Sequence, residues 1–146
     1  MLLNTQTRMW SNGPEMNNAR YGHGRTSIQA TEQSNAQIIV VGGDSDSTVE
    51  ILEVSSNSWF NIAKIPLEGL DRNCLTASNS PEYKLYSIGG NYANPNFSQD
   101  LVISLTAKAI YGLTYSNTWI HVGDLTEARA RHTTLNVARK DIPGCF

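Results

Sequence analysis

The chain has 146 residues and a formal net charge of −2, and its length suits one domain. Hydrophobic residues make up 40% and charged residues 16%, which excludes a disordered chain and leaves no basic field to bind nucleic acid or an anionic membrane. No segment reaches the roughly 20 apolar residues of a membrane span, and Met1–Thr5 lacks the features of a signal peptide, so we expect a cytoplasmic protein.

The first complete unit of the chain runs from Arg20 to Pro66. Short apolar or alternating runs predict strands at about 22–30, 36–41, 48–54 and 58–63. The second of these is almost wholly apolar and ends in Gly42–Gly43. Before the fourth, Ser56–Asn57 predicts a turn, because Ser and Asn side chains can bond the local backbone. A further strand around Arg8–Trp10 precedes this unit.

A second unit runs from Arg72 to about Leu125. Its alternating run at 83–88 ends in a second glycine pair, Gly89–Gly90. Glycine pairs at strand ends allow positive φ and a close approach of backbones, which we expect at both pairs. The segment 109–119 aligns with 49–59, and the position of the third strand of this unit stays open. The stretch Asp100–Ala107 then has no counterpart in the first unit, and part of it is a candidate for an added strand.

Arginines follow the three tryptophans of the chain at the joints between units. Trp10, Trp59 and Trp119 are each followed by a loop and then by Arg20, Arg72 and Arg129, respectively. Residues 20–23 and 129–132 share the pattern Arg-x-x-His, and a last strand is predicted from His132 to Val137. The arginines are expected to brace these joints by bonding carbonyls or carboxylates.

The order Arg, Gly-Gly, Trp at a period near 50 residues resembles the kelch repeat, from Trp10 to about Val137. The resemblance implies an all-β fold, a kelch-type β-propeller fragment of four-stranded antiparallel blades. Residues 1–146 then form a single partial propeller, with full blades at 19–66 and 71–125 and parts of flanking blades at 1–18 and 126–146. Leu75 stands where the other two copies have histidine.

The strand count is too small for a closed ring. Ten strands are predicted, whereas closed propellers have 4–8 blades of about four strands. The chain is therefore expected to be a fragment, a truncated product or one share of an assembled propeller. Open blade edges should make it associate.

The resemblance implies a protein-interaction module, as part of a ubiquitin-ligase adaptor or of a cytoskeletal scaffold. Loops after each Gly-Gly and between blades should gather on one face and bind the partner protein. The candidate partner-binding residues on these loops are Asp44, Asp46, Tyr92, Asn94, Phe97 and Arg131. Arg131 is included because it replaces the small residues Gly22 and Cys74, so that the repeat does not require it.

Other chemistry receives less support from the sequence. The alternative function is a fragment of a galactose-oxidase-like or sugar-acting propeller enzyme, but no copper set of Tyr and His can be assembled. No metal, cofactor or catalytic residue is predicted. Asp44–Ser47 has too few ligands for calcium. Cys74 and Cys145 indicate no disulfide framework, and Asn96 lies in a glycosylation pattern that matters only in a secreted chain.

Overall fold

The computed structural model describes most of the chain as antiparallel β-structure. It describes residues 1–30, 35–43, 47–62, 64–67, 70–78, 83–92, 94–98, 101–109, 113–115 and 118–134. Within these ranges, the side chains of 83, 92, 94–98, 107–109 and 113–115 are not described. No α-helix occurs in the described ranges, so none of them holds a helix that could cross a membrane.

Four consecutive strands form the first sheet in the order β3-β4-β5-β6. They are β3 (Gly24–Ile28), β4 (Gln37–Val41), β5 (Val49–Glu53) and β6 (Ser58–Ile62). Each agrees with the predicted strand to within two residues. Four antiparallel neighbours joined by short connections are what the alternating runs and the turn at Ser56–Asn57 predicted.

The second sheet repeats this order with β8 (Cys74–Ser78), β9 (Tyr83–Ile88) and β12 (Leu101–Ala109). The position of the fourth strand is shared by β13 (Leu113–Tyr115) and β14 (Ile120–Asp124), which pair with opposite ends of the long β12. The alignment of the segment from 109 onward with the third strand of the first sheet does not hold. Val102 pairs with Ile88 as Val49 pairs with Val41, so the stretch from 101 onward is the true counterpart of β5.

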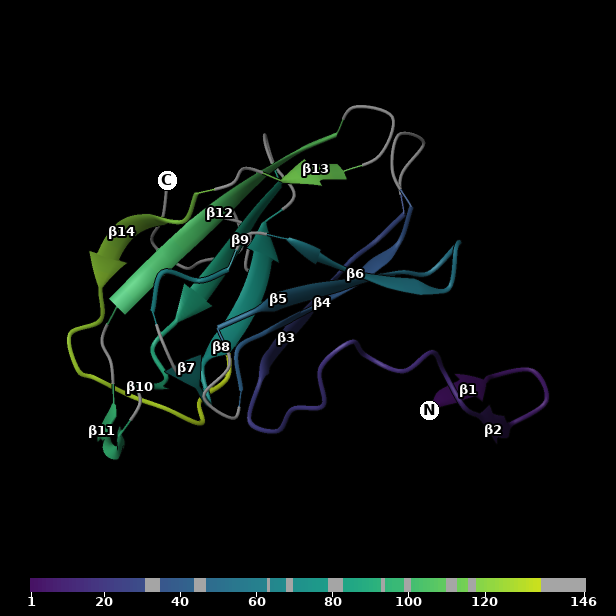
Figure 1. Ribbon diagram of the computed structural model, residues 1–146, viewed down its shortest axis with the longest axis horizontal. Helices are drawn as coiled ribbons and strands as arrows, with labels where there is room; N and C mark the ends of the chain where they lie inside the picture. The colour runs from purple at the N-terminus through teal and green to yellow at the C-terminus, as the bar shows by residue number, and fades with distance from the viewer. Residues whose placement is uncertain are drawn as a thin grey trace, which may run out of the picture.

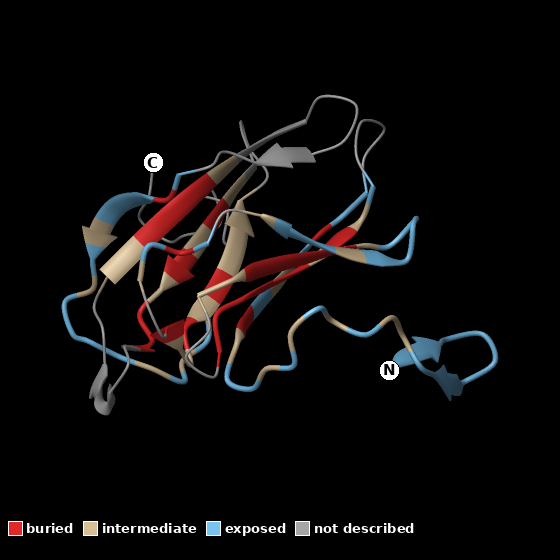
Figure 2. Cartoon of the chain, viewed as in Figure 1, coloured by how far each residue is buried: buried red, intermediate tan, exposed pale blue. Residues whose placement is uncertain are grey.

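The two sheets pack on one another through their first strands, β3 and β8. Figure 2 shows the buried residues running through the middle strands of both sheets. The shared core is apolar and includes Ile39, Ile51, Leu85, Leu105 and Trp119. Burial of this surface is the main stabilising contribution to the fold.

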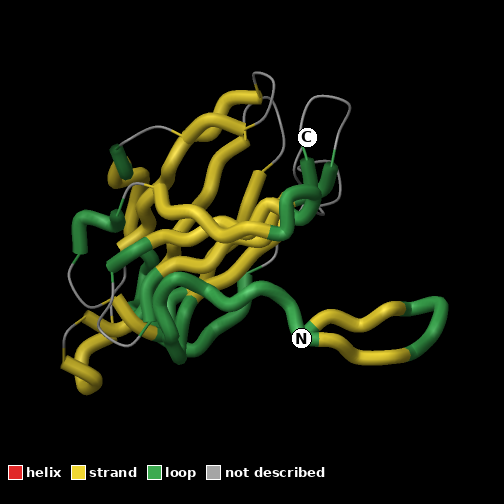
Figure 3. The backbone as a smooth tube through the Cα atoms, turned by 45° about the vertical axis from the view of Figure 1, so that its right-hand side comes forward, coloured by secondary structure: helices red, strands yellow, loops and turns green. Residues whose placement is uncertain are grey.

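Two smaller elements lie outside these sheets. Strands β1 (Leu2–Asn4) and β2 (Met9–Ser11) form a separate exposed hairpin, where only one strand had been predicted. Figures 1 and 3 show it projecting away from the rest of the chain. A three-stranded sheet is made by β7 (Leu70–Asp71), β10 (Asn91–Tyr92) and β11 (Asn94–Ser98). The strand predicted at 132–137 is not found up to Thr134, and the rest of it lies outside the described residues.

The glycine pairs at the ends of β4 and β9 have the positive φ that was predicted for them. At Gly43, φ is +92°, and a Cβ atom would lie 2.5 Å from the Tyr21 carbonyl oxygen. Only glycine avoids both the strain and the clash. The absent side chain lets the backbone at Tyr21–His23 lie close to Gly43, and the Gly43 amide donates to the Leu70 carbonyl oxygen at 2.8 Å.

We expect Gly43→Ala to lower the free energy of unfolding by about 1–3 kcal/mol, because the backbone must leave its native conformation or remain strained. Gly123→Ala is the matched control, since no heavy atom lies within 4 Å of a Cβ built there. The control should change stability by less than about 1 kcal/mol. Urea denaturation of both variants checks this, and equal losses would contradict the role assigned to Gly43.

Candidate partner-binding face

Gly22 and Arg72, which precede the two sheets, and Arg131, which follows the second, form a row of equivalent backbone positions that we call the junction ladder. The Arg72 amide donates to the Gly22 carbonyl oxygen at 2.6 Å, and the Arg131 amide donates to the Arg72 carbonyl oxygen at 3.0 Å. All three have positive φ, at 67°, 53° and 57°. Positive φ costs a non-glycine residue about 1–2 kcal/mol, so the two arginines are held there by the surrounding fold.

The ladder corrects the predicted register of the arginines. Cys74 pairs with Ile88 as Gly24 pairs with Val41, so Arg72 is equivalent to Gly22 and to Arg131. The residue equivalent to Arg20 and Arg129 is Leu70, whose carbonyl oxygen accepts from Gly43 as that of Arg129 accepts from Gly90. The predicted equivalence of Arg131 to the small residue Cys74 is therefore wrong, although its equivalence to Gly22 is confirmed.

The charged groups on and beside the ladder are unequally paired. Arg72 contacts the Asp71 carboxylate at 3.1 Å, and their side chains are 24% and 16% exposed. The other oxygen of Asp71, Oδ1, is buried with no hydrogen-bond partner in the described part of the chain. Arg129 Nη2 lies 3.8 Å from Glu127 Oε2. The Arg131 side chain is exposed.

The three-stranded sheet places other predicted residues against this row. Asn91 pairs with Asp71, and Tyr92 pairs with Leu70. Strand β11, which holds Asn94 and Phe97, pairs with β10 in turn. The structure thus brings the backbones of Tyr92 and Arg131 to the same short stretch, Leu70–Arg72. Asp44 and Asp46 lie outside the described residues, as do the side chains of Tyr92, Asn94 and Phe97.

Arg20, by contrast, is a structural residue of the first sheet. Its guanidinium forms a fully buried ion pair with Glu50 and donates to the Gly42 and Thr48 carbonyl oxygens at 2.9 and 3.1 Å. The Glu50 carboxylate also accepts from the Asn17 and Asn18 amides at 2.7 and 3.1 Å. The predicted bracing role is confirmed for Arg20. Glu50 was missed, although a lone carboxylate in the apolar run Val49–Leu52 was a usable signal.

His23 and His132 are equivalent to one another and to Asn73. Asn73 shows what this position does, because its Oδ1 accepts from the Gly24 amide at 3.1 Å and its Nδ2 donates to Ser87 Oγ at 2.8 Å. Nδ1 of His23 and both ring nitrogens of His132 are buried without a hydrogen-bond partner in the described ranges. Desolvation by burial, and then nearby arginines, lower the pKa of both histidines below the usual 6.5.

A lowered histidine pKa makes stability depend on pH in a definite direction. In the unfolded chain the two histidines bind protons near pH 6.5, whereas in the folded chain they bind them only at lower pH. Stability should therefore be fully present above pH 6.5 and fall as the pH drops from there toward the lowered folded-state pKa. We expect the double variant His23→Asn/His132→Asn, which copies the residue type of Asn73, to lose less stability on acidification. Urea denaturation midpoints across this pH range provide the measurement, and an unchanged slope would contradict it.

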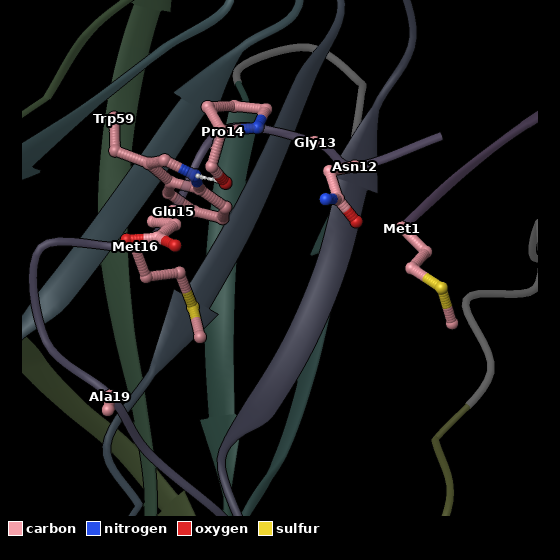
Figure 4. Close-up of a pocket in the computed structure, with 8 residues that line it drawn as sticks. All are labelled: Met1, Asn12, Gly13, Pro14, Glu15, Met16, Ala19 and Trp59. Carbon is pink, nitrogen blue, oxygen red and sulfur yellow. Dashed lines mark hydrogen bonds between the residues drawn. The ribbon is translucent and has the colours of Figure 1, made fainter. Parts of the chain in front are cut away.

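A cleft of about 580 Å³ lies where the N-terminal segment passes over β6. Figure 4 shows Trp59 beside Pro14, Glu15 and Met16, with Met1 and Asn12 across the opening. The indole Nε1 donates to the Pro14 carbonyl oxygen at 3.0 Å. Trp59 is therefore only half-buried under this segment, and the tryptophan within the common core is Trp119, which is 6% exposed.

No group of three or more potential metal ligands occurs among the described residues. Cys74 is a free thiol, and its Sγ accepts from the Thr134 amide at 3.1 Å. No protein-family model and no curated protein sequence matches the chain. The assignment of function therefore depends on the geometry described above.

Proposed function

We propose that this chain is part of a kelch-type β-propeller and that it binds another protein through the face formed by the junction ladder and β10–β11. The observation that carries the proposal is the pair of arginines, Arg72 and Arg131, at consecutive ladder positions with positive φ. Backbone conformations that cost energy are concentrated at functional sites. A glycine would fit these positions without strain, as Gly22 does. Arg72 pairs with Asp71, whereas the exposed Arg131 side chain can contact a partner.

The composition of the face agrees with a protein partner. Arginine and tyrosine are enriched among the residues that contribute most to protein interfaces, where each costs about 2 kcal/mol or more when truncated. Arg131 is exposed, and β10 brings the backbone of Tyr92 to the same stretch of chain. The kelch resemblance extends the proposal to a recognition module of a ubiquitin-ligase adaptor or of a cytoskeletal scaffold.

The proposal predicts that Arg131→Gly and Tyr92→Ala each reduce capture of a partner from lysate at least tenfold, which corresponds to about 1.4 kcal/mol. Glycine is chosen at Arg131 because it removes the side chain and tolerates the positive φ. Lys64→Ala is the matched control, since Lys64 is an exposed cation away from the ladder. Circular dichroism confirms the fold of each variant, and retention of every captured protein by both site variants would refute the proposal.

A further inference from the structure

The β1–β2 hairpin repeats the β5–β6 hairpin residue by residue. Leu3 pairs with Trp10 as Leu52 pairs with Trp59, and the flanking pairs follow the same register. Both hairpins turn through four residues, and the last of them has positive φ, +56° at Arg8 and +53° at Asn57. The hairpin therefore corresponds to the third and fourth strands of a sheet.

Within the described residues, the β1–β2 hairpin has neither of the two contacts that bury its counterpart. In the first sheet, β4 pairs with the edge of β5 that faces away from β6. The segment that follows β2 covers Trp59, whose indole Nε1 donates to the Pro14 carbonyl oxygen. Leu52 is consequently 5% exposed and Trp59 is half-buried, whereas Leu3 is 46% exposed and Trp10 is 62% exposed. The apolar side chains left in water include Leu2, Leu3, Met9 and Trp10.

The opposite end of the molecule has the complementary deficiency. Strand β14 pairs with β12 in the position of a fourth strand, and its Ile120 and Gly123 correspond to Phe60 and Ile62 of β6. Ile62 packs against the common core and Phe60 is 38% exposed, whereas Ile120 is 57% exposed. The ladder continues beyond this sheet to Arg131, the position that precedes a sheet in the two earlier copies. This end therefore offers the surface on which a further sheet would stack.

We infer that these two ends bind each other in separate copies of the chain. The β1–β2 hairpin of one copy stacks on the second sheet of another, and Trp10 lies under the segment that follows β14, as Trp59 lies under the segment that follows β2. The occupant is a second copy because each chain carries both the β1–β2 hairpin and the surface on which it would stack. The two would meet as the successive sheets of one chain already do. This inference goes beyond the proposed function, since it uses neither β10 nor the side chains of the ladder.

Such a contact joins two different surfaces, so it leaves one free end on each copy. Head-to-tail association of this kind builds rings when the rotation closes and open chains when it does not. Blocking one end in one population and the other end in a second population should leave a single productive contact. The mixture then stops at heterodimers.

The test is sedimentation velocity on the full chain over a wide range of concentration. The parent should show a sedimentation coefficient that rises with concentration, whereas Trp10→Ser and Ile120→Glu alone should lose this dependence. An equal mixture of the two variants should form dimers and nothing larger. Val54→Ser is the matched control, because Val54 is 50% exposed and belongs to neither end, and it should behave as the parent does.

Both blocked residues are exposed, and circular dichroism establishes that each variant retains its sheets. A parent that stays monomeric throughout the range would overturn the inference. Association by either variant alone to the extent seen for the parent would overturn it as well, as would a mixture that remains monomeric. Partner capture through the ladder is a separate measurement, so the two proposals can fail independently.

Discussion

Truncation of Glu50 to alanine should destabilise the chain by about 3–5 kcal/mol, because it leaves the Arg20 guanidinium buried without its carboxylate. Both side chains are fully buried, and the Asn17 and Asn18 amides lose their acceptor at the same time. Urea denaturation of the parent and of Glu50→Ala provides the measurement. A loss below about 1 kcal/mol would mean that water reaches this pair and replaces the missing partner.

The second sheet suggests a double substitution that should restore the stability lost when Glu50 alone is replaced. Leu70 occupies the position of Arg20, and Ile103 occupies that of Glu50, and both are buried in the apolar core. The chain thus contains an ion pair and an apolar pair at equivalent places. Replacing a buried ion pair by apolar residues of similar volume is often neutral or stabilising. We therefore expect Arg20→Leu/Glu50→Ile to be more stable than either single substitution, with a coupling energy of about 2 kcal/mol.

The three equivalent tryptophans should differ widely in their contribution to stability. Trp119 is 6% exposed in the common core, so Trp119→Ala should cost about 3–5 kcal/mol. Trp59→Ala should cost less, since Trp59 is half-buried and loses only partial packing and the hydrogen bond to Pro14. Trp10→Ala should be within about 0.5 kcal/mol of the parent, because Trp10 is 62% exposed.

Thermal unfolding at a concentration low enough to keep the chain monomeric separates these effects from self-association. Phe60→Ala is a suitable control for aromatic content, because Phe60 neighbours Trp59 on β6 and is 38% exposed. The register assigned to the two sheets requires the order Trp119, Trp59, Trp10. A larger loss for Trp59→Ala than for Trp119→Ala would show that the common core is misassigned.

The contrast between the buried ion pair Arg20–Glu50 and its apolar counterpart Leu70–Ile103 also explains why Arg72 was aligned with Arg20. The arginine at 72 lies two positions from Leu70, the true counterpart of Arg20, so a match of residue types selected the wrong position. Leu70 is tolerated because its opposite partner changed from Glu50 to Ile103. These partners are about thirty positions apart in sequence, as the separation of 30 between Arg20 and Glu50 shows, and only strand pairing brings them together.

Local signals in the sequence determined the all-β class, the four strands of the first sheet and the positive φ of the glycine pairs. Alternating side chains, glycine pairs and a Ser-Asn turn act over a few residues, so they can be recognised without the fold. Only the tertiary structure decided that 101–109 is the third strand of the second sheet, that Arg131 matches Arg72, and that Trp119 is the buried tryptophan. These features depend on the register between strands and on the stacking of sheets, which are fixed by hydrogen bonds and packing between distant residues.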